Sequence, residues 1–334
     1  MSDIGNSNPR TDGGTDALTY HVDGELVPAD EASVAVNDRG FMYGDAAFET
    51  LRAYGGDLFR WEDHADRLAN TCETLALDHG LDDADLRARV DETLAANHLE
   101  EAYVRLSITR GVQPGKLTPD PEIDPTVVVI AKPLPRGGRH DRGGEPRWDG
   151  PAALRTVDVR RPPENVMPSH LKTHNYLGGI LARLEIRGTG ADEALLCDVE
   201  GNVAEGTTSN VFFVDDRALH TPSLDGPVLP GVTRQVVIEL AREEGLPVDE
   251  GTFTPADLRG ADEVFITNTT GEVWPVATID GEPVGPAGED GANAAGPAGE
   301  KGSNPGGSTD GYPGGPVTRL LARLYDERIE SEFY

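Results

Sequence analysis

The stretch His170-Leu-Lys172-Thr-His-Asn175-Tyr176-Leu177 contains the residue around which we interpret the rest of the chain. Lysine is rare here, because only four of the 29 Lys and Arg residues are lysines, and an amine nucleophile would have to be one of these four. Lys116 lies in a Pro-Gly segment, Lys132 ends an apolar run and Lys301 lies in a Gly-rich tract. Lys172 alone lies between two segments rich in potential ligand-binding groups. We therefore take it as the candidate nucleophile, in preference to an ordinary solvated lysine.

The composition limits the classes of partner. A chain of 334 residues is long enough for two compact domains. The formal net charge is −30, which is unfavourable for binding nucleic-acid phosphates or an anionic membrane surface, so we expect neither partner. Arginine largely replaces lysine in this acidic chain, a composition that indicates a halophilic source, since high salt screens the self-repulsion of the charges.

The cysteines and the hydropathy pattern indicate a cytoplasmic protein. Cys72 and Cys197 are the only cysteines, too few for a disulfide framework or a cysteine-based metal site. No apolar run approaches the length of a membrane span. Residues 1–16 are polar, show no signal-peptide pattern and are predicted to form a disordered tail.

The first half of the chain, residues 17–135, is predicted to form one α+β domain. A hairpin is expected at Leu18–Val27, turning at Asp23-Gly24. From Trp61 the apolar residues Ala65, Leu68, Cys72 and Leu75 repeat with helical spacing. The other predicted elements are strands at 33–36, 46–54, 102–109 and 126–131 and a helix at 82–97.

A Pro- and Gly-rich linker, 136–150, is predicted to separate this half from a second domain at 151–334. The helix that follows Lys172 is expected to turn Ile180, Leu181 and Leu184 inward. A low-complexity segment at 280–316 is predicted to be a mobile loop. The other predicted elements are strands at 154–159, 193–197, 211–214, 264–267 and 273–277, a helix opened by Gly231, and a terminal helix at 317–329. Strands and helices do not alternate regularly, so an α+β fold is favoured over a doubly wound sheet.

Two simpler kinds of site fail on spacing. The segment 111–117 resembles a phosphate loop, but one residue is missing between its glycines and Leu117 replaces the hydroxyl that would bind magnesium. His170 and His174 are four residues apart, as in a helical zinc site, but no third ligand is evident. We expect no metal.

The remaining groups suit pyridoxal phosphate. The cofactor needs an imine-forming lysine, here Lys172, and a carboxylate that can keep its pyridine nitrogen protonated, here Glu205. It also needs turns that cradle a phosphate. Gly231 opens a helix, so backbone N–H groups could approach an anion closely there, and 267–273 is rich in hydroxyls and amides. Arg67 is suited to pair with phosphate through two hydrogen bonds.

Taken in order, these motifs resemble the class IV pyridoxal-phosphate enzymes, which include branched-chain aminotransferases, D-amino-acid aminotransferases and aminodeoxychorismate lyases. The resemblance covers roughly 18–277 and the last helix. The matching segments are Asp38-Arg39-Gly40-Phe-Met-Tyr43-Gly44-Asp45 with Phe48-Glu49, His64-Ala-Asp-Arg67-Leu68, Lys172 with Asn175-Tyr176-Leu177, and Glu205-Gly206 with Asn210-Val-Phe212 and Gly231-Val-Thr233-Arg234.

The resemblance implies a small α+β N-terminal domain, a larger C-terminal pseudo-barrel domain of α/β type and a cofactor between them. Lys172 would be the Schiff-base lysine and proton shuttle, Glu205 would pair with the pyridine nitrogen and Tyr176 would lie beside the ring hydroxyl. The phosphate would be bound by Arg67, Val232, Thr233 and Thr269. Such enzymes are at least homodimers, in which the Tyr43 loop would reach the neighbouring subunit's site.

The substrate is less constrained. In branched-chain aminotransferases a Tyr-x-Arg pattern meets substrate carboxylates, and here it is Tyr103-Val-Arg105. Arg105 would bind the distal carboxylate of glutamate, and the amides of Thr269 and Thr270 would hold the α-carboxylate. We therefore expect transamination between a branched-chain L-amino acid and 2-oxoglutarate. At Thr50 and at 267–269 the residues differ from those usual in branched-chain aminotransferases and look more like those of the lyases. Pyruvate elimination from aminodeoxychorismate is therefore the alternative. D-specificity is disfavoured, because 114–116 lacks the usual arginine.

Overall fold

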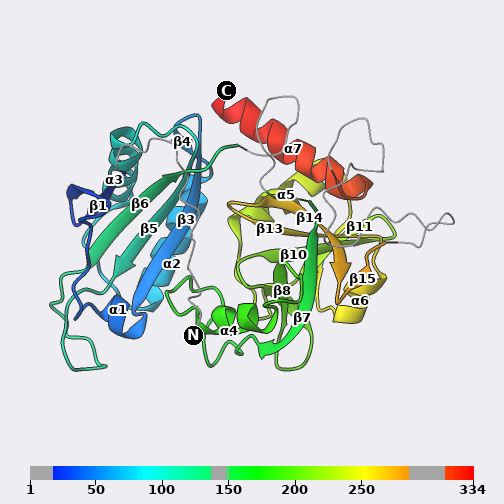
Figure 1. Cartoon of the computed structure of the whole chain (residues 1–334), viewed down its shortest axis with the longest axis horizontal. Helices are drawn as coiled ribbons and strands as arrows, with labels where there is room; N and C mark the ends of the chain where they lie inside the picture. The colour runs from blue at the N-terminus through cyan, green and yellow to red at the C-terminus, as the bar shows by residue number, and fades with distance from the viewer. Residues whose placement is uncertain (1–17, 137–147, 149, 286–312) are drawn as a thin grey trace, which may run out of the picture.

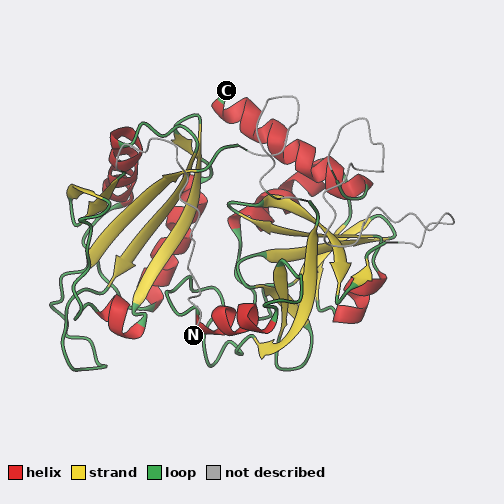
Figure 2. Cartoon of the chain, viewed as in Figure 1, coloured by secondary structure: helices red, strands yellow, loops and turns green. Residues whose placement is uncertain are grey.

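The structure, a computed structural model, describes residues 18–136, 148, 150–285 and 313–334. Two β-sheets, one in each half of the chain, face each other across a central cavity and carry helices on their outer sides (Figures 1 and 2). Among the described residues, no helix combines the length and the apolar character needed to cross a bilayer.

The N-terminal sheet has six strands, all joined antiparallel. Two helices, α2 (Trp61–Thr74) and α3 (Asp83–Ala96), cover one of its faces (Figure 1). Asp82 caps α3 by accepting a hydrogen bond from the Asp85 amide, which satisfies one of the free N–H groups at the helix start. In spatial order the strands are β2 (Glu25–Pro28), β1 (Thr19–Val22), β6 (Thr126–Pro133), β5 (Ala102–Thr109), β3 (Ala46–Tyr54) and β4 (Asp57–Leu58).

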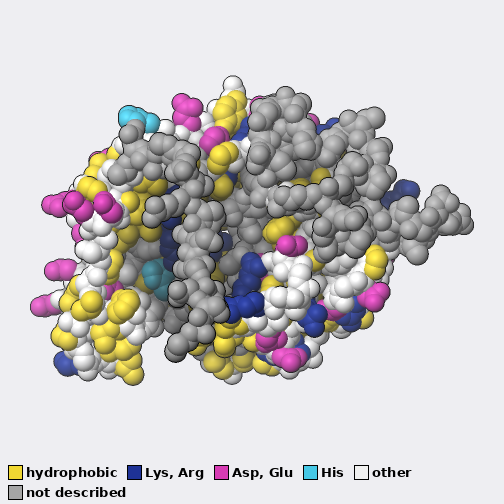
Figure 3. Space-filling model, in the orientation of Figure 1, with side chains coloured by type: hydrophobic (Ala, Val, Ile, Leu, Met, Phe, Trp, Pro, Cys, Tyr) yellow, Lys and Arg dark blue, Asp and Glu magenta, His cyan; other side chains and the backbone are white. Residues whose placement is uncertain are grey.

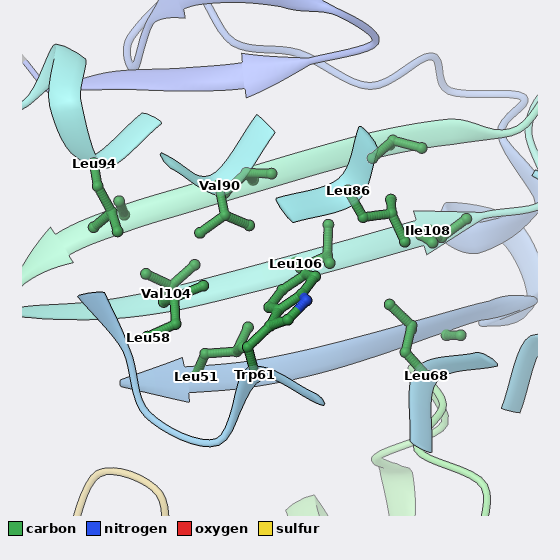
Figure 4. Close-up of a cluster of buried hydrophobic side chains, with 14 of the residues drawn as sticks. Leu51, Leu58, Trp61, Leu68, Leu86, Val90, Leu94, Val104, Leu106 and Ile108 are labelled. Atoms are coloured by element: carbon green, nitrogen blue, oxygen red, sulfur yellow. The ribbon is translucent and has the colours of Figure 1, made fainter. Parts of the chain in front are cut away.

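Because side chains alternate along a strand, the two faces of this sheet lie in different environments. On β5, Val104, Leu106 and Ile108 are fully buried against the helices, where Trp61 and Leu68 meet them (Figure 4). The intervening residues of β5 and β3 point to the opposite face, which is turned toward the C-terminal half. The core therefore anchors a strand pair whose other face is available to line a site.

The C-terminal sheet is mixed, which distinguishes it from a doubly wound parallel sheet. β7 pairs in parallel with β8 and β14, and β11 with β12, whereas its other pairs are antiparallel. The path is β12 (Val248–Gly251), β11 (Ala218–Pro222), β10 (Asn210–Asp215), β13 (Glu263–Asn268), β14 (Glu272–Ile279), β7 (Ala152–Arg160), β8 (Glu193–Cys197) and β9 (Val203–Gly206), with β15 (Glu282–Pro283) on β14. The predicted α+β class is thus confirmed.

Helices α5 (Val232–Glu243) and α7 (Pro316–Phe333) pack together on this sheet. Val236 and Leu240 of α5 are buried, and their spacing places them on one face of the helix. The C-terminal helix also contacts the N-terminal half, since Arg136 is ion-paired with Asp326 at 2.6 Å. The Tyr54 hydroxyl donates to Glu272 across the two halves at 2.5 Å. These contacts set the relative position of the two faces that enclose the cavity.

Some local predictions were wrong. Residues 33–36 form no strand, and Val34 and Val36 are exposed, because no strand in the described part of the chain pairs with them. Two short helices, α1 (Arg39–Tyr43) and α6 (Pro255–Gly260), were not predicted. β15 forms inside the segment predicted as a loop at 280–316. The predicted tail at 1–16, most of the linker at 136–150 and most of that loop lie outside the described residues.

The orientation predicted for helix α4 (Leu177–Glu185) was also wrong. Ile180, Leu181 and Leu184 are exposed, and Ala182 is the buried residue of this helix. Apolar periodicity identifies a face that favours burial but not the surface that covers it. Within a single chain this apolar face has no cover from the described residues.

Candidate active site

The cavity between the two sheets has a charge opposite to that of the whole protein. Two cavities share Lys172, Tyr176, Thr208, Asn268 and Thr269 in their linings, and we call them the inner and the outer cavity. Among the described residues, Glu205 is the single acidic one in either lining, whereas the basic ones are Arg67, Arg105, Arg160, Arg161 and Lys172. Lys and Arg side chains gather in the hollow between the two halves (Figure 3). A positive pocket in a chain of net charge −30 favours an anionic ligand.

Lys172 is held in place by its backbone. Its N–H donates to the Thr71 hydroxyl on α2 at 3.3 Å, and its carbonyl accepts from Phe48 N on β3 at 3.0 Å. The following residue, Thr173, forms a bridge with Ala47. The segment is therefore extended along β3. Every second side chain points to the same side, so Lys172, His174 and Tyr176 all line the outer cavity.

The Lys172 amine is tuned toward its neutral form. Burial, reinforced by the positive charge of Arg67, lowers the pKa of Lys172 to about 8. Its Nζ lies 4.7 Å from the centroid of the Phe48 ring. An amine with this pKa is partly unprotonated near neutral pH and can act as a nucleophile or a proton acceptor.

Glu205 lies on β9 with both carboxylate oxygens engaged. Oε2 accepts from the Leu229 amide at 2.9 Å, and Oε1 is 3.1 Å from Nε of Arg161. Burial raises the pKa of Glu205, and the charge of Arg161 opposes that shift. The carboxylate shares the inner cavity with Lys172, so the two groups that the motifs singled out line one site.

Arg67 lies beneath the inner cavity in a buried polar cluster. Its guanidinium donates to both oxygens of Glu49 at 2.7 Å and to the Pro230 carbonyl at 2.7 Å. Nδ1 of His64 is 2.8 Å from Glu49 as well. Burial would raise the pKa of Glu49, but Arg67 and His64 outweigh it and hold that pKa far below its usual range. Because an arginine has five N–H donors, Arg67 keeps donors for a further anion.

The turn above Arg67 brings a helix N-terminus to the same cavity. Gly231 caps α5 without a side-chain hydrogen bond, and Val232 and Thr233 begin the helix and line the cavity. A Cβ on Gly231 would lie 2.0 Å from Oδ1 of Asn210, so a larger residue there would displace the Asn210 side chain, whose amide donates to the Leu229 carbonyl. The free N–H groups and dipole of a helix start favour an anion. With Arg67 below, this donor set fits a phosphate ester.

Tyr176 and the Asn268 turn complete the predicted residues. Burial and the charge of Glu205 raise the pKa of Tyr176, so its hydroxyl keeps its proton at neutral pH. Thr269 lines both cavities, and Thr270 lines the outer one. Oδ1 of Asn268 accepts from the Thr270 amide at 3.1 Å, so one of the two amides predicted to hold a carboxylate is already engaged within the turn.

Tyr103 and Arg105 lie in the outer cavity, on the β5 face opposite the hydrophobic core. Arg105 stacks on Phe48, with its guanidinium carbon 3.7 Å from the ring centroid. Tyr43 does not line either cavity and instead packs against Arg39, whose guanidinium carbon is 5.2 Å from its ring centroid. The structure thus brings every predicted site residue except Tyr43 to the cavities of this chain.

Sequence reasoning did not assign Glu49, His64 and Arg161 to the site. Glu49 could have been found, because it lies two residues from the buried Leu51 on β3 and so points to the same buried face. An unpaired carboxylate on that face would be costly. His64 and Arg67 are three residues apart on α2 and so share a helix face. No local pattern pointed to Arg161, which follows β7 and reaches Glu205 only through the fold.

Comparison with known proteins agrees with this geometry. The family model described as amino-transferase class IV matches residues 46–279. A protein of Methanocaldococcus jannaschii assigned as a branched-chain-amino-acid aminotransferase is 42% identical over 80% of this chain and 90% of its own. The D-alanine aminotransferase of Listeria innocua is 36% identical over 79% of this chain and 88% of its own.

The solved structures include the T.th. branched-chain amino acid aminotransferase in complex with N-(5'-phosphopyridoxyl)-L-glutamate. It is 31% identical to this chain, with a TM-score of 0.78 over 94% of this chain and 95% of its own. The shared architecture is that of the fold-type IV enzymes. This chain therefore belongs to the class IV aminotransferases, a family of pyridoxal-phosphate-dependent enzymes.

Proposed function

We propose that this enzyme holds pyridoxal 5'-phosphate through Lys172 and transfers an amino group between a branched-chain L-amino acid and 2-oxoglutarate. The observation that carries the proposal is one cavity lined by an amine of lowered pKa, a buried carboxylate and a glycine-opened helix start. The phosphate would be bound by Arg67 with Val232, Thr233 and Thr269, and Tyr176 would lie beside the ring hydroxyl.

When bound, the cofactor supplies an electron-withdrawing ring that makes a proton on the substrate's α-carbon acidic. Lys172 Nζ is the base in reach of both cavities, and its pKa of about 8 lets it accept that proton and return it near neutral pH. Glu205 would hold a proton on the ring nitrogen. The Leu229 amide and Arg161 favour the ionised form of its carboxylate, against the effect of burial, and orient it for this task.

Replacing Glu205 with glutamine should test that role. The amide has the same shape but cannot keep the ring nitrogen protonated, so kcat should fall by about 10²–10⁴-fold while the covalent link to Lys172 still forms. The measurement pairs steady-state rates with the visible absorbance of the lysine-bound cofactor. Glu263→Gln removes a second buried carboxylate, one that accepts from the Thr318 amide at 2.7 Å and lies outside both cavity linings, and serves as control. A near-normal rate for Glu205→Gln would reject the assignment.

The substrate assignment depends on Arg105. Arg105 makes no ion pair with any described residue, although the chain contains 59 acidic residues. A partly buried guanidinium without a carboxylate in the described part of its own chain is available for the carboxylate of a ligand. Phe48, Phe41 and Val34 supply the apolar part of the same cavity, against which a branched side chain could pack.

The assay compares three reactions and a control without protein, all in high salt. Glutamate with a branched 2-oxo acid should give 2-oxoglutarate and the branched amino acid. D-alanine with 2-oxoglutarate should react much more slowly. Aminodeoxychorismate should release neither pyruvate nor 4-aminobenzoate, and a mixture without protein corrects for spontaneous reaction. Pyruvate and aminobenzoate without transamination would replace the proposal with the lyase alternative, and rapid use of D-alanine would replace it with a D-amino-acid enzyme.

The enzyme is also proposed to be a homodimer. Exposed apolar side chains occur on α4 and α1 and between β7 and α4, and exposed apolar groups that lie together mark interfaces. They are Phe41, Met42, Val166, Met167, Leu177, Ile180, Leu181 and Leu184. Hydrophobic side chains gather along the lower edge of the molecule, below α1 and α4 (Figures 1 and 3). A second copy would cover this surface and bring the Tyr43 loop toward the partner's cavity.

The double substitution Ile180→Glu and Leu184→Glu should convert the protein to monomers, because it places two charges in an apolar interface. Light scattering after size-exclusion chromatography measures the mass directly. Leu26→Glu, at an exposed apolar position on the edge strand β2, is the matched control and should leave the mass unchanged. A wild-type protein of 35.6 kDa in solution would contradict the proposal.

A further inference from the structure

Arg105 is held in place by two neighbours on the same face of the N-terminal sheet. Arg105 and Ser107 lie two residues apart on β5, so their side chains leave the same face. Nε of Arg105 donates to Oγ of Ser107 at 3.2 Å. Phe48 supports the flat side of the guanidinium at 3.7 Å. The hydrogen bond and the stacking together define the plane of the guanidinium, and its two terminal amino groups form no hydrogen bond with described residues.

Ser107 is in turn contacted by a residue from the other half of the chain. Nε2 of His174 lies 3.3 Å from Oγ of Ser107. His174 reaches this position because its N–H donates to the Ala46 carbonyl, which continues the pairing of the Lys172 segment with β3. Its ring also packs edge-on against Phe48, at 5.5 Å between centroids. One histidine therefore connects the lysine-bearing segment to the strand that carries Arg105.

In these two hydrogen bonds donation runs in one direction, from Arg105 to Ser107 and from Ser107 to His174. Arg105 can only donate, so it occupies a lone pair of Ser107 and leaves the hydroxyl proton for His174. Burial, together with the positive charge of Arg105, lowers the pKa of His174 to about 4, so the imidazole is neutral at neutral pH. A neutral imidazole with its proton on Nδ1 accepts from Ser107 through Nε2. Ser107 is 7% exposed, so its hydroxyl has little access to water as an alternative partner.

We propose that Ser107 and His174 are positioning residues that hold Arg105 ready for the distal carboxylate of a dicarboxylic substrate. They would set the preference for 2-oxoglutarate over monocarboxylic 2-oxo acids. The inference rests on the proposed role of Arg105 in the transaminase reaction. A preorganised guanidinium binds a planar carboxylate with less loss of side-chain freedom, whereas an apolar substrate side chain gains nothing from it.

The test separates the two substrate classes. In Ser107→Ala and in His174→Leu, KM for 2-oxoglutarate should rise about five- to tenfold, as expected for a weakened hydrogen bond to a charged group. KM for 4-methyl-2-oxopentanoate should change by less than about twofold. Calorimetric titration with glutarate, an unreactive dicarboxylate, should show the same loss of affinity, and titration with 4-methylpentanoate should show none.

Conservative and distant variants make the test specific. Ser107→Thr keeps the hydroxyl and His174→Gln keeps a hydrogen-bond acceptor. Both variants should therefore retain most of the glutarate affinity that Ser107→Ala and His174→Leu lose. They keep the test valid even if His174→Leu folds poorly. His220→Leu removes an imidazole on β11, outside both cavity linings, and should not change the ratio of the two KM values.

Each outcome has a separate meaning. If Arg105→Ala raises KM for 2-oxoglutarate but Ser107→Ala and His174→Leu do not, the inference fails and the proposed function stands. If Arg105→Ala has no effect, the role of Arg105 in the proposed function fails. If the variants weaken both substrate classes equally, Ser107 and His174 are structural and the inference is overturned.

Discussion

Lys172→Ala is expected to abolish turnover, with a loss of at least about 10⁴-fold, because the substitution removes both the covalent attachment and the proton-transferring amine. The purified variant should lack the visible band of a lysine-bound cofactor, and borohydride should no longer fix cofactor to the chain. Mass spectrometry of the reduced protein locates the attachment. In the wild type, attachment of added pyridoxal phosphate to the cofactor-free protein should become faster as the pH rises toward about 8, where the Lys172 amine loses its proton.

The matched control is Lys132→Ala, since Lys132 is an exposed lysine on β6 and lines neither cavity. Its rate, absorbance and borohydride reaction should equal those of the wild type. A visible band that survives Lys172→Ala would show that another lysine carries the cofactor and would reject the site.

Arg67→Ala should have the second-largest effect, on both cofactor retention and stability. A phosphate at the start of α5 would lose its charge partner, so cofactor should be lost on dialysis. The substitution also leaves Glu49, which is 1% exposed, without its two hydrogen bonds from Arg67. Removing one partner of a buried ion pair costs about 3–5 kcal/mol. Denaturant unfolding of the cofactor-free protein measures this second effect alone.

Two comparisons separate these effects. Arg328→Ala removes an ion pair of similar length, 2.8 Å from Glu243, but the Glu243 side chain is 58% exposed, so the loss should stay below about 1 kcal/mol. The double variant Arg67→Met with Glu49→Gln should recover much of the stability but not the cofactor, because no buried charge is left unpaired.

The pH dependence of stability gives a further check. Arg67 and His64 hold the pKa of Glu49 below its ordinary value of 4.5. The contribution that these two residues make to folding stability through the ionised Glu49 is therefore present above about pH 4.5. It is lost as the pH falls toward the pKa of Glu49 in the folded state. The difference between wild type and Arg67→Ala should narrow in acid. Equal stability of the two proteins at neutral pH would contradict a buried pair.

Local patterns predicted most of the regular elements. Strands 102–109 and 46–54 were predicted at the observed bounds, the first from its β-branched residues and the second from the Gly55-Gly56 turn that ends it. The helix predicted at 82–97 is observed as α3, which Asp82 caps. The predictions failed where the stabilising partner is remote: the strand expected at 33–36 has no neighbour to pair with among the described residues, and α4 turns its apolar face outward.

By itself, the sequence predicted the groups of the site: one amine among only four lysines, one carboxylate in a Gly/Thr-rich frame and a glycine-opened helix, which together suit an imine-forming phosphate cofactor. Only the tertiary structure decided how these groups are charged and oriented. Glu49 binds Arg67, Arg161 reaches Glu205 and His174 contacts Ser107, and all three contacts join segments that are well separated in the sequence. Such contacts depend on strand register and on the packing of the two halves, and burial shifts a pKa only after the chain has excluded water.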